Sequence, residues 1–97
     1  MTTAQMEAAF ERYDDEYLKF QRIQNPMHRR PDLCAFLMLD VLFPTEADMV
    51  AAAEHDEIYL EVPGEAFRSV ASDELIRDLV RCGVRYAEDH DCLVMWV

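Results

Sequence analysis

An apolar run between two prolines constrains the fold of this chain more than any other feature of its sequence. The run covers residues 33–43, with Asp40 as its only charged member, and is flanked by Pro31 and Pro44. A membrane span needs about 20 residues, so the run is too short for one. Pro31 suits the first position of a helix and Pro44 ends it. We predict a helix over 31–43, buried at the centre of the domain because it is apolar almost all round.

Aromatic side chains recur at helical spacing near the N-terminus. The members of this aromatic stripe are Phe10, Tyr13, Tyr17 and Phe20. Thr2 and Gln5 match a capping box, and Pro26 ends the pattern, so we predict a helix over 3–24. Aromatic residues are enriched in interface cores, which makes the stripe a candidate for binding a protein partner. The alternative is that it packs inside the same domain.

The remaining pattern predicts short helices and strands. The helices cover about 46–53, 65–70 and 73–82, and the strands cover about 57–62, 84–87 and 92–97. Thr45 should cap the first of these helices, and Ser72 should cap the last, which Gly83 closes. Apolar and polar residues alternate in the first strand, whereas the last strand is apolar on both faces and should lie centrally or under helices. We expect one α+β domain over 1–97, with a helical N-terminal half packed against a small antiparallel sheet.

Negative charge is concentrated in the middle of the chain. The 97 residues carry 20 acidic and nine basic side chains, a net charge of −11, and the segment 31–67 contains no Lys or Arg. Such a segment repels polyanions, so it disfavours direct binding to nucleic acid or to an anionic membrane surface. It favours a basic protein surface as the partner. Our acidic candidates for that contact are Glu54, Asp56, Glu57 and Glu61.

Cysteine usage and the N-terminus bear on location. Cys34, Cys82 and Cys92 are odd in number and lack C-x-x-C spacing, which predicts reduced thiols in the cytoplasm. The first ten residues have no cationic start followed by an apolar core, so we expect no secretory signal.

The order of elements from residue 57 onward, together with the segment 79–93, resembles a winged-helix unit. In that resemblance the helix 73–82 takes the recognition position and the turn 88–91 takes the place of the wing. It implies a transcription-associated protein, with Arg77, Arg81 and Arg85 as phosphate contacts. The turn Glu88-Asp89-His90-Asp91 departs from that pattern because its acids would face phosphates.

Two clusters combine histidine with carboxylates. His55 and Asp56 precede one predicted strand, and His90 and Asp91 precede another. Imidazole beside carboxylate can ligate a divalent metal or act as a general acid–base pair, so a small metal-dependent enzyme is one alternative. The other interpretation of both clusters is a solvated turn.

Other signatures of catalysis are missing from the sequence. It contains no Gly-x-Ser-x-Gly elbow, and its two glycines could hardly build a phosphate loop. We therefore expect a non-enzymatic, acidic protein-interaction module without a cofactor. It would act as an inhibitor or adaptor on a basic protein surface, or bind a second copy of itself.

Overall fold

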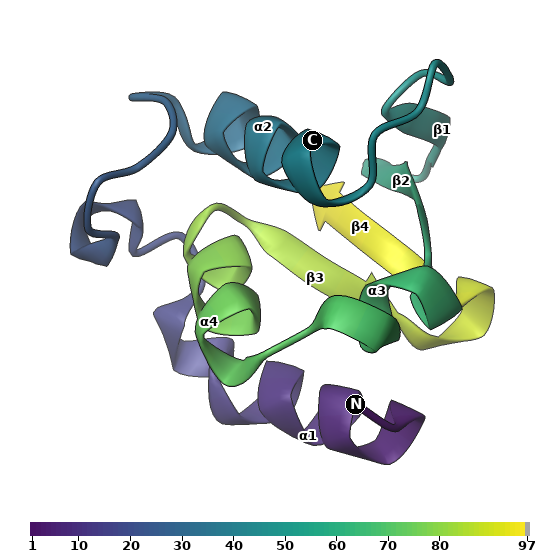
Figure 1. The fold of residues 1–97 in the computed structure, drawn as a ribbon, viewed down its shortest axis with the longest axis horizontal. Helices are drawn as coiled ribbons and strands as arrows, with labels where there is room; N and C mark the ends of the chain where they lie inside the picture. The colour runs from purple at the N-terminus through teal and green to yellow at the C-terminus, as the bar shows by residue number, and fades with distance from the viewer. Residues whose placement is uncertain (97) are drawn as a thin grey trace.

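The structure is a computed structural model that describes residues 1–96, and it has the predicted α+β architecture (Figure 1). The helices are α1 (Thr3–Arg12), α2 (Pro31–Leu42), α3 (Gly64–Val70) and α4 (Asp73–Arg81). The strands are β1 (Val50–Glu54), β2 (Glu57–Pro63), β3 (Val84–Ala87) and β4 (Cys92–Trp96). Three short 3₁₀ turns cover Asp14–Glu16, Phe20–Arg22 and Glu88–His90. Residue 97 of the last predicted strand lies outside the described residues.

The four strands form one antiparallel sheet in the order β1-β2-β4-β3. β1 and β2 form a hairpin that closes through His55 and Asp56, both of which have positive φ angles, 51° and 65°. β3 and β4 form a second hairpin, and β4 pairs with β2 as well. The apolar strand β4 is therefore central, as predicted, since it is paired on both sides.

One face of the sheet carries the hydrophobic core. Buried residues from the strands are Leu60, Val62, Val84, Leu93 and Met95, and those from the helices include Met6, Leu39, Phe67, Ile76 and Leu79. α1 and α4 lie side by side, and α2 lies on the other side of the molecule from α1 (Figure 1). All four helices thus contribute to a single cluster of buried side chains, and among residues 1–96 no helix covers the opposite face of the sheet.

Local signals at the helix ends behave as the sequence predicts. Thr2 and Gln5 form the expected capping box at the start of α1. The hydroxyl of Ser72 accepts a hydrogen bond from the backbone N–H of Leu75 at the start of α4. Gly83 follows α4 with a φ of 97°, a value that favours glycine.

The predicted helix over 3–24 is wrong in its length, because α1 ends at Arg12. A straight helix of 22 residues would be about 33 Å long, whereas the longest dimension of the molecule is 28 Å. The chain instead bends through two 3₁₀ turns, with Leu18 at a φ of 61° between them. This bend keeps Tyr17 and Phe20 against the core.

The predicted helix over 46–53 is also wrong. Residues 50–54 form β1, and the hydroxyl of Thr45 accepts a hydrogen bond from Ala47 N–H in a local turn rather than capping a helix. Alanines favour a helix by themselves, but here the ladder to β2 supplies their backbone hydrogen bonds. Tertiary pairing has overridden the local preference.

α2 begins and ends close to the predicted residues but is not the buried centre of the domain. Three of its residues are buried, namely Cys34, Ala35 and Leu39. Four of its large apolar side chains are exposed, namely Leu33, Leu37, Val41 and Leu42. α2 therefore covers one side of the core and presents an apolar face to solvent.

Candidate functional site

The helix-free face of the sheet gathers aromatic and acidic side chains from three strands and the turn before β4. We call it the acidic sheet face. Its members are Glu57, Tyr59, Glu61, Arg85, Glu88, Asp89, His90 and Trp96. Strand register explains the gathering, because Tyr59 and Arg85 both pair with Val94, and Glu57 pairs with Trp96. Directly paired residues point to the same side of a sheet.

Aromatic rings form the floor of this face. The rings of Tyr59 and His90 meet edge to face with their centroids 4.8 Å apart. The guanidinium of Arg85 lies 5.1 Å from the centre of the Trp96 ring. Half of Trp96 is still exposed, at 50%. An exposed indole beside a guanidinium is a surface that already accommodates a cation, because the ring face is negative.

Two hollows lie on either side of the Tyr59–His90 pair, which lines both of them. The first has a volume of about 470 Å³, and Glu57, Glu88 and Asp89 contribute to its wall. The second has a volume of about 380 Å³, and Glu61, Glu65 and Asp91 contribute to its wall. Each hollow therefore has an apolar or aromatic wall. The first also offers three carboxylates and the second offers two, since the carboxylate of Asp91 is hydrogen-bonded to Arg68 and Tyr86.

Local electrostatics follow from this crowding of carboxylates. Partial burial raises the pKa of the Tyr59 phenol, and the negative charges of Glu57, Glu54 and Asp89 raise that pKa further. These groups come from both hairpins, so the fold concentrates charge that is dispersed in the sequence. The potential over the face favours a cationic ligand.

The four acidic residues that the sequence proposes for partner binding all lie on the β1–β2 hairpin. Glu57 and Glu61 line the hollows, whereas Glu54 and Asp56 are exposed at the turn end of the hairpin. The alternation in β2 places Tyr59 on the same face as the two glutamates, but the sequence did not indicate Tyr59 as part of a binding surface. It gave no indication of Trp96.

The aromatic stripe lies elsewhere and packs inside the chain. All four of its side chains are partly buried against the core. The ring of Phe10 lies 6.2 Å from that of Phe67 and 6.0 Å from that of Tyr86, between centroids. Phe10 and Tyr17 also line a pocket of about 250 Å³ beside β3. These contacts give the stripe a role in the fold, and its role toward a partner stays a prediction.

The two histidine clusters occupy different turns. His55 lies at the tip of the β1–β2 hairpin, with Nε2 at 3.1 Å from the carboxylate of Glu54. His90 packs on Tyr59 as described. Within residues 1–96, no group of three or more His, Cys, Asp or Glu side chains is arranged to hold a metal ion. Metal-dependent catalysis through these histidines remains a prediction from the sequence.

Asp91 is engaged by other side chains. Its carboxylate accepts hydrogen bonds from Arg68 Nη1 at 2.7 Å and from the Tyr86 hydroxyl at 2.7 Å. The hydrogen bond from Arg68, followed by that from Tyr86, lowers the pKa of Asp91. Gly64 packs closely here, since a Cβ at that position would clash with the carboxylate of Asp91. Asp91 therefore joins α3 to the β3–β4 hairpin.

The arginines that the winged-helix resemblance implies as phosphate contacts also have partners within the chain. Arg81 Nε donates to Glu16 at 2.8 Å, and Arg77 Nε lies 3.3 Å from Asp78. Arg22 reaches the other oxygen of Glu16. The order strand, helix, helix, strand, turn, strand is present over β2 to β4, and the resemblance itself stays a prediction.

The cysteines are free thiols, with Cys34 and Cys82 buried and Cys92 half-buried. Burial, together with the neighbouring Cys34 thiol, raises the pKa of Cys82 well above its ordinary value. A raised pKa disfavours the reactive thiolate, so Cys82 acts as a small core residue. Across residues 1–96, the structure contains no helix with the length and apolar character that crossing a membrane requires.

Comparisons of the chain with protein-family models, with curated proteins and with solved structures find no match. The function is therefore inferred from the chemistry of the acidic sheet face and its surroundings.

Proposed function

We propose that this protein is an acidic interaction module that binds a basic segment of another protein through its acidic sheet face. The observation that carries the proposal is the half-exposed Trp96, which lies beside the Arg85 guanidinium on a face that also carries the carboxylates of Glu57, Glu88 and Asp89. A lysine or arginine of the partner would lie on the indole or the Tyr59–His90 pair, and the carboxylates would neutralise its charge.

Shape supports an extended segment rather than a single small ligand. The two hollows share Tyr59 and His90, so they lie next to each other along β2 and the turn before β4. Each contains several carboxylates, which suits successive basic side chains of one peptide. β1 adds a row of five exposed residues at the edge of the same sheet. A basic protein bound to this face could no longer bind its own anionic ligands through the same surface. An inhibitor or adaptor of a basic protein would act in this way.

Trp96 provides a direct assay because it is the only tryptophan in the chain. We expect a lysine-rich peptide of about ten residues to change the emission of Trp96 in a saturable manner. The same peptide with glutamates in place of its lysines should cause no change. Binding should weaken steeply when salt is raised from low ionic strength to beyond physiological levels, because the contact is largely electrostatic.

Matched substitutions assign the binding to this face. Glu57→Gln with Glu61→Gln should weaken peptide binding by about tenfold or more, since both carboxylates line the hollows. Glu11→Gln with Glu74→Gln removes the same charge from exposed positions on α1 and α4 and should change it little. Equal effects of the two pairs, or binding that is insensitive to salt, would contradict the proposal.

A further inference from the structure

The outward face of α2 carries four large apolar side chains that the described residues leave exposed. Its exposed side chains are Leu33 (38%), Leu37 (39%), Val41 (66%) and Leu42 (39%). The first three follow one another at intervals of four residues, so they form a stripe along one side of the helix. This stripe, Leu33–Leu37–Val41, is separate from the acidic sheet face, because none of its members lines either hollow.

The two ends of the stripe carry charges of opposite sign. Arg29 and Arg30 are exposed just before α2 begins, whereas Asp40, Glu46 and Asp48 are exposed at or beyond its C-terminal end. None of these five forms an ion pair within residues 1–96. Along the stripe the helix therefore presents a basic end, an apolar middle and an acidic end, and these five charges have no ion-pair partner among the described residues. Asp32, in the first turn, lies on a different side of the helix from Leu37.

This pattern is complementary to that of a second α2 that runs in the opposite direction, because the basic end of one helix then lies beside the acidic end of the other. If a second α2 packs antiparallel on the first with Leu37 near the twofold axis, Leu33 of each copy faces Val41 of the other. Arg30 then lies about one helical turn from Asp40 of the second copy, within reach of an arginine side chain. A twofold axis forms each of these contacts twice, and the antiparallel helix dipoles oppose each other favourably.

We propose that the protein forms a homodimer through antiparallel packing of α2 against α2. The net charge of −11 opposes self-association in general, so the local pairing of basic and acidic ends is what selects a second copy in this orientation. The arrangement leaves the acidic sheet faces of the two copies free. A dimer would therefore offer two of these faces to a partner that carries repeated basic segments.

Sedimentation velocity tests the dimer directly. At about 100 μM, above the micromolar dissociation constants that modest interfaces reach, we expect a species of twice the 11.3 kDa chain mass. Leu37→Glu should give a monomer, because it places two carboxylates near the twofold axis. Val70→Glu serves as the matched control, since Val70 is an exposed apolar residue outside α2, and it should leave the dimer intact. Circular dichroism would confirm that both variants are folded.

Charge reversal tests the orientation. Arg29→Glu with Arg30→Glu in one protein, and Asp40→Arg with Glu46→Arg in another, should each weaken the homodimer by at least about tenfold. An equimolar mixture of the two should recover a dimer, because both contacts of the mixed pair are then attractive. A monomeric parent protein, a dimer that survives Leu37→Glu, or a mixture that stays monomeric would each overturn the proposal.

Discussion

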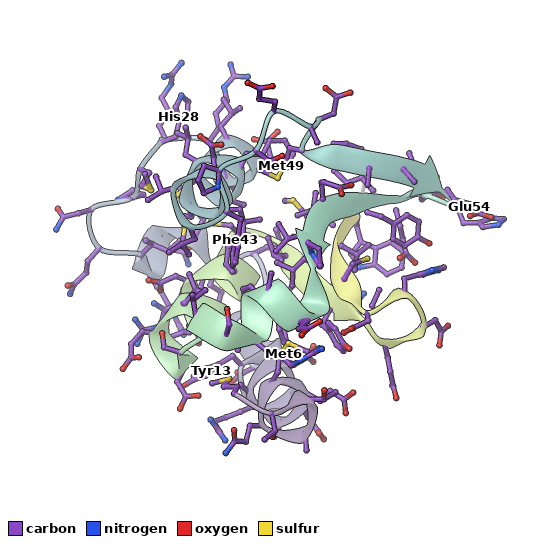
Figure 2. The ribbon with its side chains drawn as sticks, turned by 45° about the vertical axis from the view of Figure 1, so that its right-hand side comes forward. Met6, Tyr13, His28, Phe43, Met49 and Glu54 are labelled. Carbon is purple, nitrogen blue, oxygen red and sulfur yellow. The ribbon has the colours of Figure 1, made fainter. Side chains whose placement is uncertain are left out.

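α2 and α4 each bury three side chains against the same core, but their outer faces differ in kind. The outer face of α4 is charged, and its Arg81 is joined to Glu16, so the chain itself completes that side of the molecule. The outer face of α2 is apolar, and its flanking charges have no partners among the described residues. Figure 2 shows His28, which precedes α2, on the other side of the molecule from Met6 and Tyr13.

The difference teaches that total hydrophobicity does not decide burial. α2 is the more apolar helix by composition, yet it leaves four large apolar side chains exposed. α4 is mostly polar, yet Ile76, Leu79 and Val80 are all buried because they lie on one face. Whether polar and apolar residues lie on separate faces of a helix determines how completely its apolar residues are buried. An apolar helix without such separation has exposed apolar residues that another molecule can contact.

The largest expected effect compares truncation in the two helices. Leu79→Ala in α4 removes a fully buried side chain and should lower the free energy of unfolding by about 2–5 kcal/mol. Leu37→Ala in α2 should lower it by only about 1 kcal/mol or less, because that residue is already 39% exposed. Urea denaturation of both variants, at concentrations where both sediment as monomers, measures the difference. Similar losses would show that α2 is seated as firmly as α4.

A second effect depends on pH and on Glu16, whose carboxylate joins the first 3₁₀ turn to Arg81 of α4. The hydrogen bond from Arg81, together with the charge of Arg22, lowers the pKa of Glu16 in the folded protein, although burial partly opposes them. The ionised carboxylate therefore stabilises the fold at pH values above its unfolded pKa of about 4.3. This stabilisation is lost as the pH falls through the lower folded pKa.

Glu16→Gln should accordingly be less stable than the parent protein near pH 7, and the two should converge in acid. Thermal unfolding at a series of pH values between about 7 and 3 measures the gap in stability between the variant and the parent protein. Glu11→Gln, an exposed position on α1 without such partners among the described residues, is the control and should show no gap. A gap that stays constant with pH would mean that Glu16 acts through packing rather than charge.

The smallest expected effect concerns helix capping. Ser72→Ala removes the side-chain cap of α4 and should cost about 1 kcal/mol. The corresponding residue of α2 is Arg30, whose side chain makes no capping hydrogen bond, so Arg30→Ala should cost almost nothing in the monomer. Chemical denaturation of the two variants compares the helix starts. A loss for Arg30→Ala as large as that for Ser72→Ala would show that Arg30 stabilises α2 in another way.

Prediction from the sequence succeeded where a local signal and the tertiary environment agreed. Ser72, the apolar positions of α4 and Gly83 all indicated the same helix, and the structure contains it. Prediction failed for residues 46–53, where the alanines and a capping pattern favoured a helix. There the turn at His55 and Asp56 pairs β1 with β2, and this pairing is decided by a neighbouring strand rather than by the segment itself.

The candidate site could be predicted only in part, for a similar reason. Glu57 and Glu61 stood out because charge is visible in a sequence. Trp96 did not, because its strand is apolar on both faces, and only the pairing of β4 with β2 and β3 shows which side faces solvent. The sequence therefore could not predict that the two hairpins come together on one face of the sheet.

The sequence by itself determined the α+β class, most of the helices and strands, and the excess of negative charge, because these follow from spacing, capping residues and composition. The tertiary structure alone decided where the N-terminal helix ends, that residues 50–54 form a strand, and which face of each element is exposed. Those features depend on contacts between segments far apart in the chain, and their energies exceed the weak local preferences of the residues involved.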